Sequence, residues 1–286
     1  MMRYEDRFWS SRDGLKLHYR DYAGSDSRPP VVCLHGLTRN ARDFAELAER
    51  LSPQWRVLVP EMRGRGESEY ARDAAAYNPL QYVEDVLALL EECAIDRFVA
   101  VGTSLGGLMT MLLALQMPGR IAGAVLNDVG PRLEPAGIER IKNYVGQGRS
   151  FPTWVHAARA LEEVHGIAYP GKDLPFWIAA AKRVMMLSSN ARIVFDYDMK
   201  IAEAFTTLDP EAEQADLWPA WEALAGRPLL VIRGAVSDLL SADTLDRMQE
   251  RVPEAEAVTV LGVGHAPMLT EPEAVDAIDR LLARVA

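Results

Sequence analysis

The stretch from Phe98 to Gly119, FVAVGTSLGGLMTMLLALQMPG, decides the fold of this 286-residue chain. It holds no charged side chain and is long enough to cross a bilayer of ~30 Å as a helix. Glycines and polar residues at 102–107 nevertheless interrupt the apolar run. β-Branched residues stand before the interruption, and Leu and Met dominate after it. The pattern therefore predicts a buried strand, a tight turn and a buried helix rather than a membrane-spanning segment.

The same alternation of strand and helix extends outward from this unit in both directions. Short apolar runs typical of strands occur at 31–34, 55–60, 121–126, 228–233 and 257–261. Helical spacing of apolar residues occurs at 41–51, 79–92 and 273–285. Two segments that flank Asp13-Gly14 predict an antiparallel hairpin at the sheet edge. We therefore expect an α/β fold with a mostly parallel, eight-stranded sheet and helices on both faces.

The strand pattern stops between Pro131 and about Asp216. Helical stretches take over, at 136–144, 153–164, 174–186 and 193–204. An insertion after a sheet strand would cover the carboxyl edge of the sheet, where open α/β sheets bind their ligands. We therefore expect a core domain of residues 1–130 and 217–286, and a helical cap, or lid, of residues 131–216 inserted in it.

The turn at 102–106 fits the pattern G-x-S-x-G, with a strand before it and a helix after it. A serine in such a strained turn exposes its hydroxyl above the sheet, and only glycines two positions away let the neighbouring chain approach. A phosphate-binding turn would need G-x-G-x-x-G or an ending G-K-[ST], and neither occurs here. Ser104 is therefore the candidate nucleophile.

A serine nucleophile needs a base, usually a histidine that a carboxylate orients. Only His265 follows Ser104 outside the expected cap, in a loop of small residues after the last strand. Two carboxylates compete for the third position, since Asp238 follows the strand at 229–233 and Asp128 also ends a strand. We favour Asp238, because the chain after Asp128 turns directly into the cap. As a helix cap, Asp238 would have no role in the site.

Acyl transfer also requires donors for the oxyanion, and backbone amides suffice. In this geometry one is the amide of the residue after the nucleophile, Leu105, and the other comes from the loop after the early strand. Leu37 is the candidate in that loop. We interpret its neighbour His35 as a residue that organises the loop rather than as a proton carrier.

These motifs resemble the α/β-hydrolase fold family, in its lid-bearing, esterase-like branch with a Ser-Asp-His triad. The resemblance covers nearly the whole chain and rests on five features, listed in chain order: His35-Gly36, the loop 61–68, the turn 102–107, Asp238 and Gly264-His265. It implies Ser104 as nucleophile, Asp238 as acid and His265 as base. It also implies oxyanion amides at Leu37 and Leu105. Members that open epoxides or displace halides carry an acid at the turn, so Ser104 argues against those reactions.

Tryptophans of the expected cap are candidates for a substrate pocket. Trp154 and Trp177 would line an apolar acyl site, although such residues at helical spacing are more often part of a core. His156 and His165 are too far apart for ligands on one helix turn, and no cysteine or acidic cluster accompanies them. We therefore expect neither a metal nor a cofactor.

Charge and cysteine content restrict the class of partner. The formal net charge of −10 repels phosphate backbones and anionic lipid surfaces, so neither nucleic acid nor membrane is expected. The two cysteines and an N-terminus without an apolar run indicate a reducing, cytoplasmic setting. The protein would then be a monomer or a homodimer that acts on a small molecule.

The predicted function is a serine hydrolase that cleaves carboxylic esters of small or medium apolar acids through an acyl-enzyme on Ser104. A lactone, as an internal ester, is a further candidate substrate. Two alternatives stay open, since fold does not decide between them. One is hydrolysis of a carbon–carbon bond in a β-diketone or dienoic acid by the same triad. The other is a non-catalytic ligand-binding receptor of the same fold.

Overall fold

The sheet contains eight strands in the part of the chain that the computed structural model describes, residues 4–206 and 215–285. Their bounds are β1 Glu5–Ser10, β2 Lys16–Tyr22, β3 Val31–Leu34, β4 Val57–Pro60, β5 Phe98–Thr103, β6 Ile121–Asn127, β10 Leu229–Gly234 and β11 Glu256–Val260. Their order across the sheet is β1-β2-β4-β3-β5-β6-β10-β11. The prediction of an α/β fold with a mostly parallel, eight-stranded sheet is confirmed.

The antiparallel part of the sheet is confined to its N-terminal edge. β1 and β2 pair in antiparallel register with Trp9 opposite Leu17, and β2 pairs antiparallel with β4. From β4 to β11 all pairs are parallel. The carboxyl ends of these six strands consequently share one edge, on which the loops after β3, β5, β6, β10 and β11 meet.

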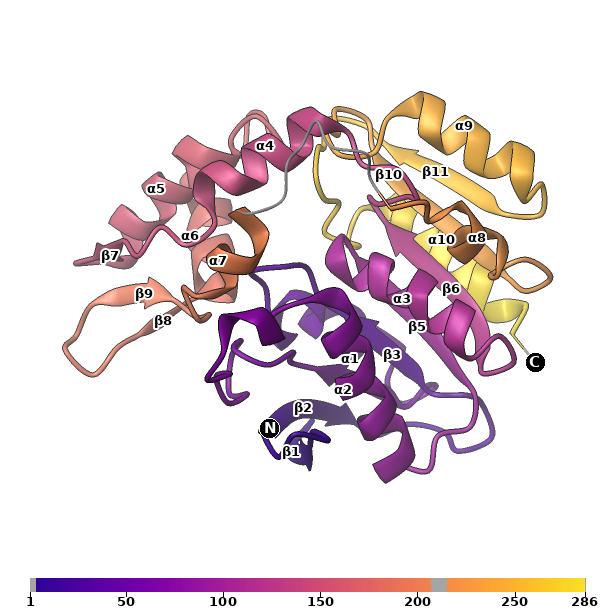
Figure 1. Cartoon of the computed structure of the whole chain (residues 1–286). Helices are drawn as coiled ribbons and strands as arrows, with labels where there is room; N and C mark the ends of the chain where they lie inside the picture. Colours follow the sequence, from indigo (N-terminus) through magenta and orange to yellow (C-terminus); the bar gives the residue numbers. More distant parts are fainter. Residues whose placement is uncertain (1–3, 207–214, 286) are drawn as a thin grey trace.

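Helices cover both faces of the sheet, which explains why every residue of β3, β4 and β6 is buried. One hydrophobic core contains side chains of α2 Pro79–Glu92, α3 Leu105–Gln116, α8 Trp218–Glu222 and α9 Ala242–Arg251. The other contains side chains of α1 Ala45–Leu51 and α10 Pro272–Ala283. The short helices η1 Ala41–Phe44 and η2 Ala74–Ala76 lie in loops. Figure 1 shows the sheet between these layers.

The described residues 131–206 of the inserted segment lie over one end of the core (Figure 1). Its described part holds four helices and three short strands: α4 Pro135–Tyr144, β7 Ser150–Phe151, α5 Trp154–His165, α6 Leu174–Val184, β8 Met185–Leu187, β9 Ile193–Phe195 and α7 Ile201–Thr206. The strands form a small antiparallel sheet, β7-β9-β8. Residues 207–214, within the expected cap, lie outside the described residues.

Two of the helices predicted for this segment differ from the structure. The helix expected at 174–186 ends at Val184, and the start of the helix expected at 193–204 is strand β9. The sequence Ile-Val-Phe of β9 suits a pleated strand, because its branched and aromatic side chains pack well between two neighbours. Strands of two or three residues are too short for a period-of-two pattern to reveal them.

Ion pairs connect the inserted segment to the core. Arg42 contacts Asp196, Arg183 contacts Glu46, and Arg140 contacts Asp238. A backbone bridge between Arg65 and Tyr197 adds a further contact. Among the described residues, no helix is both long enough and apolar enough to cross a membrane.

Candidate active site

Ser104 occupies a strained turn between β5 and α3. Its φ of 54° and ψ of −115° lie outside the helical and strand regions. A Cβ on Gly102 would lie 2.4 Å from the backbone of Gly106, and one on Gly106 would lie 1.9 Å from the carbonyl oxygen of Leu34. Glycine is therefore required at both positions for the turn to pack against the sheet.

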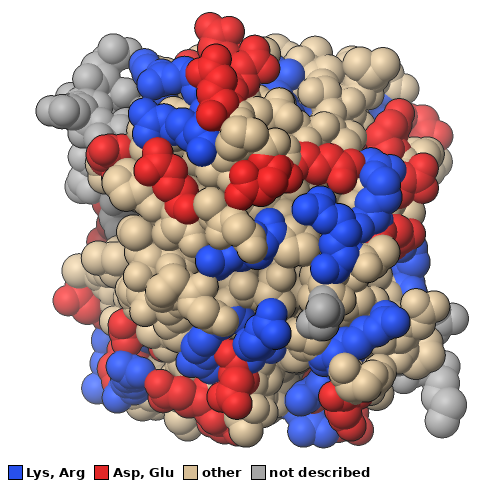
Figure 2. Space-filling model, turned by 90° about the vertical axis from the view of Figure 1, so that its right-hand side faces the viewer, with Lys and Arg blue, Asp and Glu red and all other residues tan. Residues whose placement is uncertain are grey.

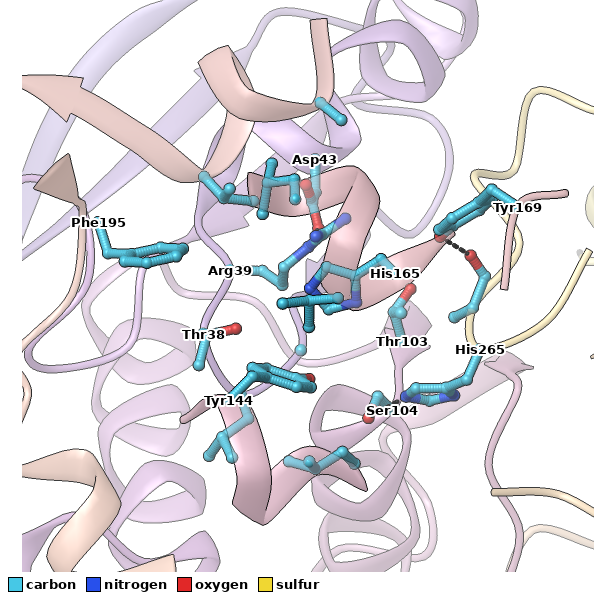
Figure 3. A pocket seen from close by; sticks show the side chains of 18 of the residues that line it. Thr38, Arg39, Asp43, Thr103, Ser104, Tyr144, His165, Tyr169, Phe195 and His265 are labelled. Atoms are coloured by element: carbon cyan, nitrogen blue, oxygen red, sulfur yellow. Dashed lines mark hydrogen bonds and ion pairs between the residues drawn. The ribbon is translucent and has the colours of Figure 1, made fainter. Parts of the chain in front are cut away.

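His265 reaches Ser104 from the loop after β11. Its Nε2 lies 3.0 Å from the Oγ of Ser104, and the ring is 8% exposed (Figure 3). The neighbouring glycine allows a close approach, because a Cβ on Gly264 would lie 2.9 Å from the Cα of Ala168. The small residues that the sequence places around His265 thus serve the packing of this loop.

Asp128, at the end of β6, completes the hydrogen-bonded chain. Its Oδ2 lies 2.8 Å from Nδ1 of His265, and the side chain is fully buried. The N–H of Gly234 donates to Oδ1 at 2.7 Å, and the hydroxyl of Ser237 donates to Oδ2 at 2.6 Å. Because the carboxylate accepts from Nδ1–H, Nε2 of His265 is left to accept the proton of Ser104.

The structure does not place Asp238 against His265, so this part of the sequence prediction is wrong. Both Nε and Nη2 of Arg140, on α4, donate to the carboxylate of Asp238, the latter at 2.9 Å. Burial opposes ionisation of this carboxyl, yet the hydrogen bonds and charge of Arg140 hold its pKa below the ordinary value. Asp238 therefore ties α4 to the core, and its rival Asp128 takes the position beside the histidine.

The loop after β3 brings unpaired backbone donors to the same place. Among the described residues, neither the N–H of Leu37 nor that of Leu105 has a hydrogen-bond acceptor. Leu105 is the first residue of α3, where free N–H groups and the helix dipole favour negative charge. A Cβ on Gly36 would lie 3.7 Å from the Cβ of Ser104, so this loop adjoins the nucleophile.

His35 holds this loop in place, as its interpretation from the sequence expected. Its Nδ1–H donates to the carbonyl of Gly36 at 2.8 Å, and its Nε2 accepts from the N–H of Met62 at 3.0 Å. Burial, together with the charge of Arg65, lowers the pKa of His35 to about 4. The ring is therefore neutral at pH 7 and has no nitrogen free for catalysis.

A cavity opens above Ser104, between the core loops and the inserted segment (Figure 3). Its volume of about 110 Å³ is comparable with the ~150 Å³ of an engineered cavity that holds benzene, so a small acyl group fits. Trp177, one of the two tryptophans predicted to bind substrate, lines the cavity beside Tyr169 at a ring separation of 6.0 Å. Trp154 does not contribute to the lining, so its predicted place in the pocket is wrong. It packs instead at the edge of the second core, near Lys182.

Sequence reasoning missed three polar residues of the cavity wall. Arg39 follows the His35-Gly36 loop, and Tyr144 and His165 come from α4 and α5. The rings of Tyr144 and His165 meet edge to face at 4.8 Å. For Arg39, the available sequence signal is its position two residues after Leu37 of the oxyanion loop. The rings of Tyr144 and His165 reach the cavity only through the tertiary packing of the inserted segment, so no sequence signal reveals them.

In the described part of the chain, no group of three or more histidine, cysteine or acidic side chains is arranged so that it could hold a metal ion. Cys33 and Cys93 are free thiols, and burial raises the pKa of Cys33. Acidic and basic side chains are interspersed on the face that Figure 2 shows.

Comparisons with known proteins show which family the fold belongs to. A model of a family described as the alpha/beta hydrolase family matches residues 31–278. A 3-hydroxybutyrate-oligomer hydrolase from Cupriavidus necator is 35% identical over 90% of this chain and 89% of its own length. A 2-(acetamidomethylene)succinate hydrolase from Mesorhizobium japonicum is 25% identical over 94% of this chain and 92% of its own length. A crystal structure of an alpha/beta hydrolase from Novosphingobium aromaticivorans superposes with a TM-score of 0.96 at 60% identity, over all of both chains.

Proposed function

The chain belongs to the alpha/beta hydrolase family, and on that premise we propose that it cleaves carboxylic esters through an acyl-enzyme on Ser104. That it is a hydrolase acting on ester bonds agrees with its relatives, which are named hydrolases and esterases. The observation that carries the mechanism is the unbroken chain of hydrogen bonds from Ser104 through His265 to Asp128. The same observation weighs against the receptor alternative, since a protein that only binds a ligand has no use for it.

The proposed reaction begins with proton transfer. Nε2 of His265 takes the hydroxyl proton of Ser104 while Oγ attacks the ester carbonyl. Asp128 holds the ring in the Nδ1–H tautomer and stabilises the imidazolium that forms. His265 then gives the proton to the leaving alcohol, and the carbonyl reforms as an acyl-serine. A water molecule, deprotonated by the same nitrogen, attacks the acyl-serine. His265 then returns this proton to Oγ of Ser104 as the bond to the acyl group breaks, which releases the acid.

The negative charge of each tetrahedral intermediate requires donors that are already in place. We assign this role to the backbone amides of Leu37 and Leu105, which have no acceptor in the described part of the chain. Nε of Arg65 donates to the carbonyl of Leu37 at 2.9 Å, which fixes the orientation of the loop. Losing one such donor typically costs ~10²–10³ in kcat.

The inserted segment supplies the wall of the acyl site in this proposal. It contributes apolar and aromatic side chains to the cavity above Ser104, among them Trp177 and Phe195. A segment that closes over bound substrate would exclude water and act as a lid. The substrate would then be an ester of a small or medium acid, as the cavity volume supports.

The name of the relative from Cupriavidus necator supports one substrate class in particular. We include short linear esters of 3-hydroxy acids among the proposed substrates, next to simple alkyl esters and lactones. Carbon–carbon hydrolysis of a β-diketone remains the second candidate, because the same three side chains can perform it.

The free thiols support a reducing, cytoplasmic setting.

A substrate panel tests the proposal. Purified protein and its Ser104→Ala variant are assayed against p-nitrophenyl butyrate, a dimer of 3-hydroxybutyrate, a lactone and a β-diketone. We expect an initial burst of nitrophenol with the ester and hydrolysis of the dimer, both abolished in the variant. Faster turnover of the diketone than of every ester would transfer the function to carbon–carbon bonds. Equal rates in wild type and variant would overturn the mechanism.

A further inference from the structure

Arg39 presents unpaired hydrogen-bond donors to the cavity beside the nucleophile. Its Nε donates to Oδ2 of Asp43 at 2.6 Å. Among the described residues, its Nη1 and Nη2 donate to no acceptor, and the side chain is 29% exposed. Arginine at a protein site usually makes several hydrogen bonds through its planar fork, so the two outer nitrogens are available to a ligand.

Asp43 orients the guanidinium of Arg39 through one hydrogen bond and leaves the two outer nitrogens free for a ligand. Oδ2 of Asp43 accepts the hydrogen bond from Arg39, and the other oxygen, Oδ1, is buried and has no hydrogen-bond partner among the residues that the structure describes. Figure 3 shows the guanidinium of Arg39 next to Asp43 at the inner wall of the cavity, with His165 nearby. A side chain fixed through one nitrogen loses little entropy when its other nitrogens bind a ligand.

The position of Arg39 relative to Ser104 follows from the loop that carries it. A Cβ on Gly36 would lie 3.3 Å from Cγ of Arg39 and 3.7 Å from Cβ of Ser104. The two side chains therefore start from the same part of the cavity floor. A substrate with its scissile carbonyl at Ser104 would reach the guanidinium after a few bonds.

The charge of the cavity wall favours an anion, in contrast to the acidic chain as a whole. Arg39 and Arg149 line the cavity with Asp43 as the one acidic side chain among its described lining residues. His165 adds no charge of its own, because burial and the nearby Arg39 lower its pKa to about 3. With a formal net charge of −10 on the chain, a positive wall at this site is a local feature.

We propose that Arg39 binds a free carboxylate of the substrate, so that the preferred substrates are esters that also carry an acid group. The proposal rests on the function proposed above and narrows its substrate class. Two parallel N–H groups match the two oxygens of a carboxylate, and such charge-assisted pairs are about twice as strong as neutral ones. The rest of the wall is largely apolar and accommodates the carbon chain between the two ends.

Matched acid and amide probes test this assignment. One pair is the linear dimer of 3-hydroxybutyrate and its terminal primary amide, with the charge on the alcohol side. The other is monomethyl glutarate and methyl glutaramate, with the charge on the acyl side. Each amide has the shape of its acid without the charge. In at least one pair, we expect wild-type kcat/KM to be about 10- to 100-fold higher for the acid.

Two variants of Arg39 and a control outside the cavity lining show whether Arg39 causes the preference for the acid. Arg39→Gln should bring the ratio of acid to amide in that pair to near one, mainly through KM. Arg39→Lys keeps the ion pair with Asp43 but lacks the fork, so it should retain part of the preference. Arg12→Gln removes an exposed charge that pairs with Glu84 and Glu91 and does not line the cavity, and it should leave the ratio at its wild-type value.

Calorimetry with Ser104→Ala separates this inference from the proposed function. The acid of the preferred pair should bind more tightly than its amide, and adding Arg39→Gln should abolish the difference. Turnover that depends on Ser104 with equal rates for acids and amides would overturn the role of Arg39 and leave the esterase standing. Absence of Ser104-dependent turnover would overturn the esterase, and binding would still decide the role of Arg39. Equal binding of acid and amide would reject it.

Discussion

Oδ2 of Asp128 lies 2.8 Å from Nδ1 of His265, although 137 positions separate the two residues in the chain. The sheet makes this contact possible, because β10 pairs with β6 in a register that sets Ile232 opposite Asn127. The loop after β10 therefore lies directly beside the end of β6. Its Gly234 and Ser237 donate to the carboxylate of Asp128 and hold it toward the histidine.

The two candidate acids differ in their expected effect on catalysis. Asp128→Asn should lower kcat by about 10⁴-fold, because an amide favours the wrong tautomer of His265. Asp238→Asn should cost less than about tenfold, since this carboxylate contacts Arg140 and not the histidine ring. Both are measured as kcat/KM on p-nitrophenyl butyrate, with circular dichroism as the control for folding. The opposite ranking would return the acid role to Asp238.

Substitutions of Trp177 and Trp154, both in the inserted segment, should differ in their effect on the preferred length of the acyl chain. Trp177→Phe enlarges the cavity and should shift the optimum toward longer acyl chains, with each methylene worth about 1–3 kcal/mol. Trp154→Phe is the matched control, because that ring does not line the cavity, and it should leave the profile unchanged. The profile is kcat/KM for esters from acetyl to octanoyl. A shift with Trp154→Phe alone would contradict the cavity described here.

The depressed pKa of His35 makes a prediction for stability against pH. An unfolded histidine titrates near pH 6.5, whereas burial and Arg65 lower the pKa of His35 to about 4 in the fold. Between these values the unfolded chain binds a proton that the folded chain does not. The free energy of unfolding must therefore fall as pH falls, by up to about 1.4 kcal/mol per pH unit from this residue.

Urea denaturation of His35→Gln between pH 6.5 and 4.5 measures that contribution. The variant cannot titrate at this position, so its stability should fall less steeply with acid than that of the wild type. His165 titrates in both proteins and cancels in the difference. Identical slopes for the two proteins would mean that His35 does not change its protonation on unfolding in this range.

The glycines of the nucleophile turn should tolerate no side chain. Gly106→Ala places a Cβ 1.9 Å from the carbonyl oxygen of Leu34, and backbone atoms cannot move aside as a side chain does. We expect a loss of stability of about 1–3 kcal/mol or more, together with lost activity. Gly119→Ala is the control, because a Cβ there meets nothing within 4 Å, and its stability should stay within about 1 kcal/mol. Thermal unfolding of both variants compares them.

The nucleophile turn and the core sheet could be predicted because local rules determine them. The strand before Ser104 is apolar from Phe98 to Gly102, and the G-x-S-x-G pattern is complete within residues 102–106, although Gly106 also packs against Leu34 of the neighbouring strand β3. His265 could be identified as the base by elimination, since it is the one histidine that follows Ser104 in the sequence and lies outside the insertion. These inferences needed no knowledge of which strands are neighbours.

The choice between Asp128 and Asp238 did depend on neighbours, and there the sequence argument failed. Both residues follow parallel strands and reach the same edge of the sheet. The sequence predicts that the turn into the inserted segment carries Asp128 away from the histidine. Asp128 instead adopts a φ of 56°, and its side chain stays over the sheet edge. Arg140 holds Asp238, and no local pattern reveals that a helix of the insertion brings a guanidinium there.

The cavity wall was hidden for a similar reason. Residues of α4, α5, α6 and β9 meet in it, and their order along the chain does not say which faces turn toward Ser104. The small sheet β7-β9-β8 sets the end of this wall with strands too short to leave a periodic signal. Arg39 is the exception, because its position after the His35-Gly36 loop already places it near the nucleophile.

Intact-protein mass spectrometry after acid quench tests the central claim most directly. Wild-type protein is mixed with p-nitrophenyl butyrate and quenched during turnover, in parallel with Ser104→Ala and Asp128→Asn. We predict that the wild type gains the mass of one butyryl group, which peptide mapping places on Ser104, and that Ser104→Ala gains none. Asp128→Asn should acquire the same mass far more slowly. Turnover of the wild type with no acylated protein, or acylation of Ser104→Ala to the same extent, would contradict catalysis through an acyl-enzyme on Ser104.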